Sequence, residues 1–100
     1  KHSVFAPFFG IQAATITATE RIASSNNSPV LCFSVKRDNK RCKWRLLFDK
    51  EIENFPAESS SESAGILNNA LEKIIRECPE QYLWMHRRFK TRPPDEVSFY

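Results

Sequence analysis

An amphipathic segment that ends at a proline constrains the fold of this chain more than any other feature. Between residues 67 and 78 apolar side chains recur every three or four positions, the spacing of one helix face: Leu67, Leu71, Ile74, Ile75 and Cys78. Ser59 and Glu62 have the spacing of an N-terminal capping box, and Pro79 ends the pattern. The sequence therefore predicts a helix whose apolar stripe packs against the rest of a folded core.

Two apolar segments with strand character precede this helix. Residues 30–35 form a continuous apolar run, which is typical of a strand in the middle of a sheet covered on both faces. Residues 42–48 instead alternate, with Trp44, Leu46 and Phe48 on one face. The polar residues 37–40 between them predict a turn, so we expect the two strands to form a hairpin.

The remaining segments complete one mixed α/β unit. Val4–Phe9 predicts a short strand, and Pro7 within it favours a sheet edge. Residues 15–25 predict a helix that ends at the polar run 26–29, while the acidic, Ser-rich residues 49–63 predict a loop. We expect about two to four strands and two main helices, in one modest domain of 100 residues.

Neither a membrane span nor a metal site is expected. The uncharged stretch 3–19 is shorter than the roughly twenty apolar residues that a bilayer requires. Cys32, Cys42 and Cys78 are odd in number and lack C-x-x-C spacing, and neither His2 nor His86 lies at a zinc-ligand spacing from them. We therefore expect free thiols, with Cys32 and Cys78 buried, in a reducing compartment.

The most unusual composition is in residues 79–93. This run mixes Tyr, Leu, Trp, Met and Phe with His, three Arg and a Lys. Such a surface suits an anionic and apolar partner, because rings stack on bases or lie at lipid headgroups while Arg binds phosphate. The alternative is a packing element that turns Leu83, Trp84 and Phe89 inward and leaves its charges in solvent.

Residues 79–93 resemble the C-terminal signature of the lipid A biosynthesis acyltransferases, the late lauroyl and myristoyl transferases of Gram-negative bacteria. Three further stretches resemble the same family in the same order: 4–10 with 13–15, 29–37, and 53–56. The resemblance covers residues 3–100. It implies that residues 1–100 are the C-terminal fragment of one acyltransferase domain, with a truncated start, an authentic end and no cofactor. One departure is Cys32, where the family usually carries a proline.

The resemblance also implies a catalytic His-x-x-x-x-Glu/Asp pair. Five residues after His2 stands Pro7, and five after His86 stands Thr91, so neither histidine has the carboxylate. We expect the pair upstream of residue 1, assign no catalytic residue, and expect the isolated chain to be inactive. A Cys78–His86 pair is disfavoured, because nothing in the sequence near Cys78 would activate its thiol.

Two groups of cations are candidate binding residues. The resemblance implies that a C-terminal group holds phosphate or sugar carboxylates of a lipid A precursor: Arg87, Arg88, Lys90 and Arg92. Alternatively, Arg87 or Arg88 packs against the acidic residues 49–62 and fixes the C-terminus, while Tyr82 and Trp84 belong to the core. A second group would meet an anionic partner, acidic phospholipid or acyl carrier protein, or would simply be a solvated hairpin tip: Lys36, Arg37, Lys40 and Arg41.

The function implied is part of an acyltransferase that moves a fatty acyl group from acyl carrier protein to a lipid A precursor in lipopolysaccharide biosynthesis. The implied location is the cytoplasmic face of the bacterial inner membrane. A nucleic-acid-binding module is an alternative suggested by the pI of about 8.9. It is disfavoured by a net charge of only +3 and by the acidic segment 49–62. A non-catalytic interaction module of the same fold is the third possibility.

Overall fold

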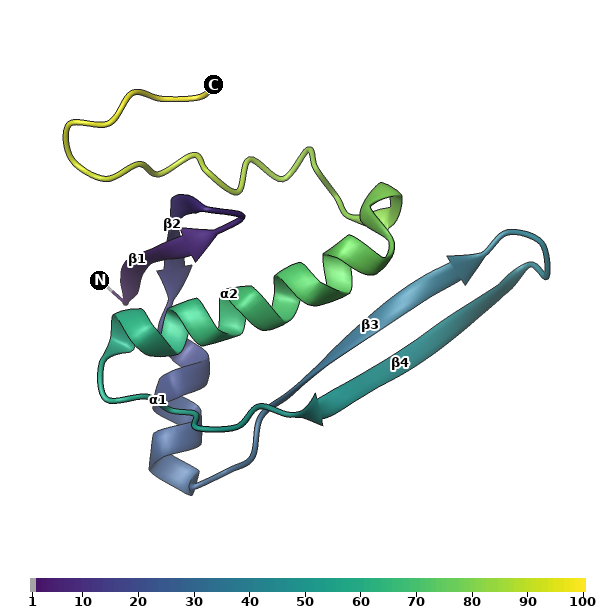
Figure 1. The fold of residues 1–100 in the computed structure, drawn as a ribbon, viewed down its shortest axis with the longest axis horizontal. Helices are drawn as coiled ribbons and strands as arrows, with labels where there is room; N and C mark the ends of the chain where they lie inside the picture. The colour runs from purple at the N-terminus through teal and green to yellow at the C-terminus, as the bar shows by residue number, and fades with distance from the viewer. Residues whose placement is uncertain (1) are drawn as a thin grey trace.

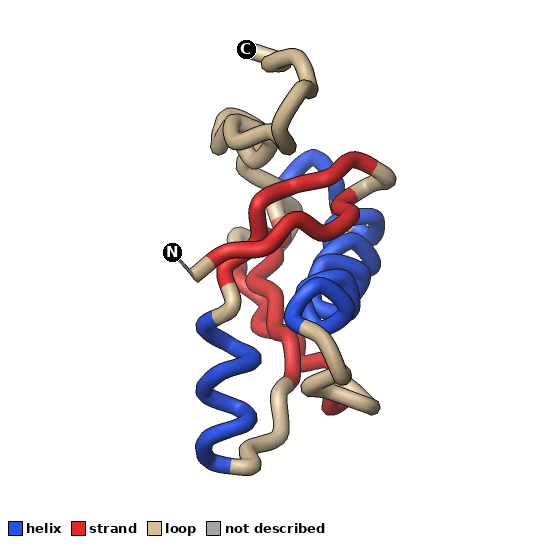
Figure 2. Tube along the Cα trace, turned by 90° about the vertical axis from the view of Figure 1, so that its left-hand side faces the viewer, coloured by secondary structure: helices blue, strands red, loops and turns tan. Residues whose placement is uncertain are grey.

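The computed structural model describes residues 2–100 and confirms a mixed α/β unit with two main helices (Figure 1). The elements follow in the order β1 (Ser3–Phe8), β2 (Ile11–Ile16), α1 (Ala18–Asn26), β3 (Leu31–Asp38), β4 (Lys43–Glu51) and α2 (Ser60–Glu77), with a 3₁₀ turn η1 (Pro79–Gln81). The strands form two separate antiparallel pairs, β1 with β2 and β3 with β4. Helix α1 extends toward one end of the molecule, and the C-terminus lies at the other (Figures 1 and 2).

A tight hairpin joins β1 to β2, and the second of these strands was not predicted. Phe8 pairs with Ile11, so the turn is Phe9 and Gly10 alone. Both turn residues have positive φ, 50° and 76°, as two-residue hairpins of the twisted I′ type require. The predicted helix at 15–25 is therefore wrong at its start, because Thr15 and Ile16 are β-branched residues that pair with β1.

Helix α2 has the predicted N-terminal cap, but the residues it buries differ from the predicted stripe. The Ser59 hydroxyl accepts the Glu62 backbone N–H at 3.2 Å, which is one half of a capping box. The helix buries four residues, Ser63, Ala64, Asn68 and Ile75. Of the predicted stripe, Ile75 is buried whereas Leu71 is 43% exposed. Most of the stripe is thus rotated away from the β1–β2 hairpin, which the helix contacts through Ile75 together with smaller and polar side chains.

The core lies between α2 and the β1–β2 hairpin. Phe8, Ala13 and Ile75 form its buried cluster, and the half-buried rings of Phe9, Tyr82 and Phe89 pack around it. The Phe8 ring centroid lies 4.7 Å from that of Phe9, 6.4 Å from that of Tyr82 and 5.9 Å from that of Phe89. Aromatic rings from both ends of the sequence therefore close one core, as predicted for Tyr82.

The predicted β3–β4 hairpin is present, but the covered sheet around it is not. β3 pairs with β4 alone among the residues described, and Phe33 and Val35 are 60% and 51% exposed. In Figure 1 the hairpin projects as a separate arm beside α2. The register shifts between Leu31 and Phe33, so Cys32, in place of the expected family proline, stands at an irregularity in the ladder.

Residues 82–100, the C-terminal tail, contain no helix or strand and pass along the β1–β2 hairpin (Figure 2). Within the tail, Leu83 and Trp84 are 66% and 56% exposed, so only Phe89 of the three expected inward residues is half-buried. The Trp84 indole still donates to the Pro79 carbonyl at 2.7 Å. Across residues 2–100, no helix combines the length and the apolar character needed to span a bilayer.

Candidate functional site

A cavity of about 670 Å³ lies where β2, the first residues of β3, α2 and the C-terminal tail meet. Its lining is mixed. The apolar part consists of Ala14, Ile16, Val30, Leu31, Leu67 and Leu71, and the cationic part of Arg87, Arg88 and Lys90. Thr15, Thr19, Cys32, Asn68, His86 and Thr91 complete it. The cavity therefore offers both apolar surface and positive charge to one ligand.

The apolar part of the lining results from the rotation of α2. Leu67 and Leu71 belong to the predicted stripe, but they face the cavity rather than the β1–β2 hairpin. Ile16 at the end of β2 is 68% exposed on the same cavity. Large aliphatic groups that remain open to solvent cost free energy and favour an apolar occupant.

Arg88 anchors the tail beside this cavity. Its guanidinium donates to the Ala14 carbonyl at 2.7 Å, to the Thr15 hydroxyl at 3.0 Å and, more weakly, to the Asn68 side-chain oxygen at 3.4 Å. It also lies 5.1 Å from the Phe8 ring centroid, within cation–π range. The predicted alternative that an arginine fixes the C-terminus is therefore right for Arg88, but its partners are β2 and α2, not the acidic residues 49–62.

Asn68 is the buried centre of this polar network and was missed in the sequence. It is 1% exposed, and its amide donates to the Pro7 carbonyl at 3.0 Å and to the Thr15 hydroxyl at 3.1 Å. The amide nitrogen thus donates two hydrogen bonds, and the side-chain oxygen accepts weakly from Arg88. Partners for both polar atoms are the condition for burying an amide. The available signal was a polar residue next to Leu67 on the apolar side of a predicted helix.

Arg87 and Lys90 are the cavity cations with charge left to offer. Both are exposed, and neither forms an ion pair within the described part of the chain. Arg87 lies 5.6 Å from the Tyr100 ring centroid, an exposed contact that leaves the guanidinium donors free. Of the predicted group, Arg87 and Lys90 are thus the cavity cations whose charged ends are not engaged by hydrogen bonds or ion pairs among residues 2–100.

Arg92 belongs elsewhere, because it does not line the cavity. It donates to the Gln12 carbonyl and to Glu96, and it lies 4.4 Å from the Phe99 ring centroid. Gln12 and Ala14 are alternate residues of β2, so their carbonyls point to the same strand edge, away from β1. Arg88 and Arg92 together bind that edge, which is where a further strand would otherwise pair.

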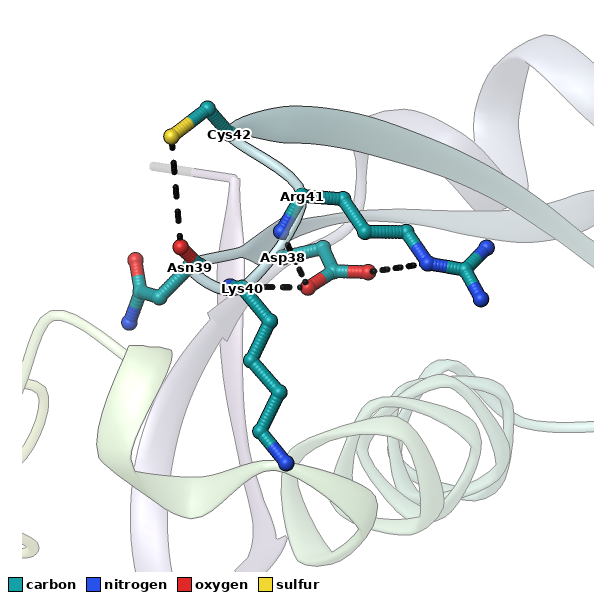
Figure 3. A network of polar contacts seen from close by, with 5 residues as sticks. All are labelled: Asp38, Asn39, Lys40, Arg41 and Cys42. Carbon is teal, nitrogen blue, oxygen red and sulfur yellow. Dashed lines mark hydrogen bonds and ion pairs between the residues drawn. The ribbon is translucent and has the colours of Figure 1, made fainter.

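The second predicted group of cations does not form one surface. Lys36 pairs with Glu77 at 2.8 Å, on the hairpin face toward α2. At the tip, Asp38 accepts the backbone N–H groups of Lys40 and Arg41 at 3.1 and 3.2 Å and lies near the Arg41 guanidinium (Figure 3). The carboxylate both shapes the turn and offsets part of its charge. Lys40 extends away from this network.

Arg37 is held through its backbone. Its N–H donates to the Gln81 side-chain oxygen at 2.7 Å, and its carbonyl accepts from the Gln81 amide nitrogen at 2.9 Å. The side-chain amide therefore substitutes for a neighbouring strand at this point of β3. This contact attaches the hairpin to η1, and the Lys36–Glu77 ion pair attaches it to the end of α2.

The three thiols are free, and the surroundings of Cys32 and Cys78 do not activate them as nucleophiles. Cys32 and Cys78 are half-buried rather than buried, and Cys42 is exposed at the hairpin turn. The Cys78 thiol donates to Glu80 at 3.1 Å, and this bond raises the pKa of Cys78 while lowering the pKa of Glu80. Burial, with a smaller contribution from Asp49, raises the pKa of Cys32. A nucleophile requires the opposite shift.

Within residues 2–100, no three His, Cys, Asp or Glu side chains gather closely enough to hold a metal ion. The same residues contain no His-x-x-x-x-Glu/Asp pair. The chemistry that the cavity lining itself offers is apolar contact from its aliphatic side chains and positive charge from Arg87, Arg88 and Lys90.

Comparison with known proteins identifies the family. Residues 1–91 match the family model described as bacterial lipid A biosynthesis acyltransferase. The whole chain is 39% identical to a lipid A biosynthesis palmitoleoyltransferase and 36% identical to a lipid A biosynthesis lauroyltransferase, both of Escherichia coli K12. A Haemophilus influenzae lipid A biosynthesis acyltransferase is 30% identical over 97% of the chain. The chain belongs to the lipid A biosynthesis acyltransferase family, and it spans about a third of the length of these relatives.

Proposed function

We propose that this chain forms the acceptor-binding part of an enzyme that transfers a fatty acyl group from acyl carrier protein to a hydroxyl of a lipid A precursor. The cavity carries the proposal. A phosphorylated glycolipid has both acyl chains and anionic groups, and the cavity places Leu67 and Leu71 beside Arg87 and Lys90. The family match supports the reaction class, since the relatives are named as acyltransferases of lipid A biosynthesis.

The two kinds of lining have separate tasks in this proposal. Arg87 and Lys90 bind phosphate or sugar carboxylate, because charge-assisted hydrogen bonds to oxyanions are among the strongest available to a side chain. The aliphatic lining accepts part of an acyl chain. Arg88 positions the tail that bears both cations, since its own donors are bound to β2 and α2.

The chemistry of transfer is an exchange of a thioester for an ester. The acceptor hydroxyl oxygen bonds to the thioester carbonyl carbon, the carbon–sulfur bond breaks, and the carrier protein leaves as its thiol. A base must take the hydroxyl proton. Residues 1–100 lack the His-x-x-x-x-Glu/Asp pair implied by the resemblance, so this base would be supplied by the part of the family domain outside the matched third. The proposed setting is the cytoplasmic face of the inner membrane.

Binding of a phosphorylated lipid A precursor in detergent micelles tests the proposal. We expect the double variant Arg87→Ala, Lys90→Ala to bind at least about tenfold more weakly, because bonds to charged groups contribute about 1.5–3 kcal/mol each. The matched control is Arg21→Ala, Lys73→Ala, which removes one Arg and one Lys that do not line the cavity. Equal losses in both doubles would refute the site and leave only general charge attraction.

Two further assays complete the test. The isolated chain, mixed with acyl carrier protein thioester and acceptor glycolipid, should give no product, because it lacks the His-x-x-x-x-Glu/Asp pair. Turnover above background would contradict that expectation. Retention on single-stranded RNA in preference to micelles at moderate salt would favour the nucleic-acid alternative instead.

A further inference from the structure

Large apolar side chains cover the outer face of the β3–β4 hairpin, which is the face opposite to that of Lys36, the partner of Glu77 on α2. Cross-strand pairing places Phe33 opposite Phe48, Val35 opposite Leu46, and Arg37 opposite Trp44, so these side chains share one face. Phe33, Trp44 and Phe48 are 60%, 70% and 67% exposed. A lone two-stranded hairpin is marginally stable in water, and an apolar patch of this kind marks an interface.

The free edge of β4 is a second feature that a partner of the hairpin must satisfy, because its backbone groups lack a neighbouring strand among residues 2–100. The N–H and the carbonyl of Arg37 both point away from β4 and bond to the Gln81 side chain. Arg37 and its cross-strand partner Trp44 therefore exchange no backbone hydrogen bonds with each other. By alternation, the backbone groups of Trp44, Leu46 and Phe48 point to the opposite edge of the hairpin. Within residues 2–100 that edge has no strand neighbour. It is a nine-residue strand open to pairing.

These two observations together indicate a protein occupant. A lipid surface would accept the apolar face, but unpaired backbone groups on the same strand are costly in hydrocarbon. The continuous apolar run at residues 30–35 is typical of a strand covered on both faces, and only the face toward α2 has a neighbour here. The full relatives supply a suitable neighbour, because they are about three times as long as the segment that this chain matches.

We propose that the outer face and the β4 edge of the hairpin are the surface on which the remaining two thirds of a lipid A acyltransferase domain packs. That part of the domain lays an apolar layer over Phe33, Val35, Trp44, Leu46 and Phe48 and places a backbone segment along β4. The proposal rests on family membership and not on the acyl-transfer reaction or the cavity, so its test uses no activity measurement.

The test is a chimera in which this chain replaces the segment that it matches in the Escherichia coli palmitoleoyltransferase. Backbone hydrogen exchange of residues 31–51 is compared between the isolated chain and the chimera, with α2 as the internal marker of folding. We expect the hairpin amides to exchange rapidly in the isolated chain and at least about 100-fold more slowly in the chimera, since buried sheet amides open only in larger unfolding events. Hairpin amides that stay unprotected while α2 is protected would overturn the proposal.

Two substitutions sharpen the comparison. Phe48→Glu places a charge on the outer face, and Arg45→Glu alters a charge on the opposite face of the same strand. In the chimera, we expect Phe48→Glu to abolish the protection of the hairpin amides and Arg45→Glu to leave it unchanged. In the isolated chain, where the hairpin amides already exchange rapidly, neither substitution should change their exchange. If the chimera does not fold, the same exchange is measured on this chain co-expressed with the remaining two thirds of the relative as a separate polypeptide, where absent protection again overturns the proposal.

Two other occupants would give distinct results with the isolated chain. Hairpin protection that rises with protein concentration, together with dimers in sedimentation, would show that a second copy covers the face. Protection gained on vesicles containing anionic phospholipid, and not in the chimera, would show a membrane contact. Either result, with the hairpin unprotected in the chimera, replaces the proposed occupant.

Discussion

The Arg88 guanidinium donates to the Thr15 hydroxyl at 3.0 Å, and this hydrogen bond joins residues 73 positions apart in the sequence. Thr15 is 8% exposed and also accepts from Asn68, so the bond connects the tail to the polar centre of the fold. Arg88, one of four cations in the tail predicted from the sequence as candidate phosphate ligands, thus has its guanidinium bound to β2 and α2.

Replacing Arg88 with Met should lower the free energy of unfolding by about 2–3 kcal/mol, because the Ala14 carbonyl and the Thr15 hydroxyl lose a charged donor. Urea denaturation followed by circular dichroism measures the change. Arg87→Met is the matched control at the adjacent, exposed position, and we expect a change within about 0.5 kcal/mol there. Equal effects at the two positions would contradict the anchoring role of Arg88.

Asn68→Ala should be among the most destabilising substitutions in α2. It removes the donor to the Pro7 carbonyl and to the Thr15 hydroxyl at a site that is 1% exposed. Leaving buried polar groups without partners costs about 1–3 kcal/mol. The neighbouring Asn69 is exposed, so Asn69→Ala is the control and should have little effect on thermal or urea unfolding. A stable Asn68→Ala variant would show that water replaces the amide.

Ser59→Ala should weaken the start of α2 by about 1 kcal/mol, because the hydroxyl that accepts the Glu62 N–H is lost. Ser61→Ala, two positions further along in the first turn, is exposed and should be neutral or slightly stabilising. The readout is the urea midpoint of each variant at constant m value. An unchanged midpoint in Ser59→Ala would mean that solvent caps this helix equally well.

The hydrogen bond between Cys78 and Glu80 predicts that part of the stability of the folded chain depends on pH. It needs the thiol protonated and the carboxylate ionised, so it raises the pKa of Cys78 and lowers the pKa of Glu80. Its contribution is lost when the pH falls through the lowered pKa of Glu80, and again when the pH rises through the raised pKa of Cys78.

Alkylation of Cys78 measures this effect directly. In a Cys32→Ser, Cys42→Ser background, the rate of reaction with iodoacetamide should rise only above the usual pH range for a cysteine. Glu80→Gln should move the midpoint to lower pH, whereas Glu53→Gln, a remote exposed carboxyl, should not move it. If Glu80→Gln leaves the pH midpoint of alkylation unchanged, the hydrogen bond to Glu80 is not the cause of the raised pKa of Cys78.

Local patterns in the sequence predicted local structure well. The β3–β4 hairpin, the cap at Ser59 and the helix that ends before Pro79 depend on turn residues and periodicity within a few positions. The β2 strand was missed because Ile11–Ile16 continues into α1 without a strong break. The signal was Gly10, which with Phe9 permits a turn with two positive φ angles.

The candidate site was predictable only in part. Positive charge in the tail was evident. Its division between Arg87 and Lys90, whose charged ends are not engaged by described residues, and Arg88 and Arg92, which bind β2, depends on contacts more than 70 residues apart. The orientation of α2 could not be predicted either, because Asn68 is buried through partners on β1, β2 and the tail. Such long-range satisfaction of polar groups leaves little trace in local periodicity.

The guanidiniums of Arg88 and Arg92, which bind the edge of β2, affect the solubility of the protein. By occupying the Gln12 and Ala14 carbonyls, they block the sheet edge where another molecule could add a strand. Proteolytic trimming of the last fourteen residues would remove Arg88 and Arg92 together and leave that edge bare. The trimmed product should be prone to intermolecular aggregation. The tail, although it contains no helix or strand, therefore keeps the protein soluble by covering this edge.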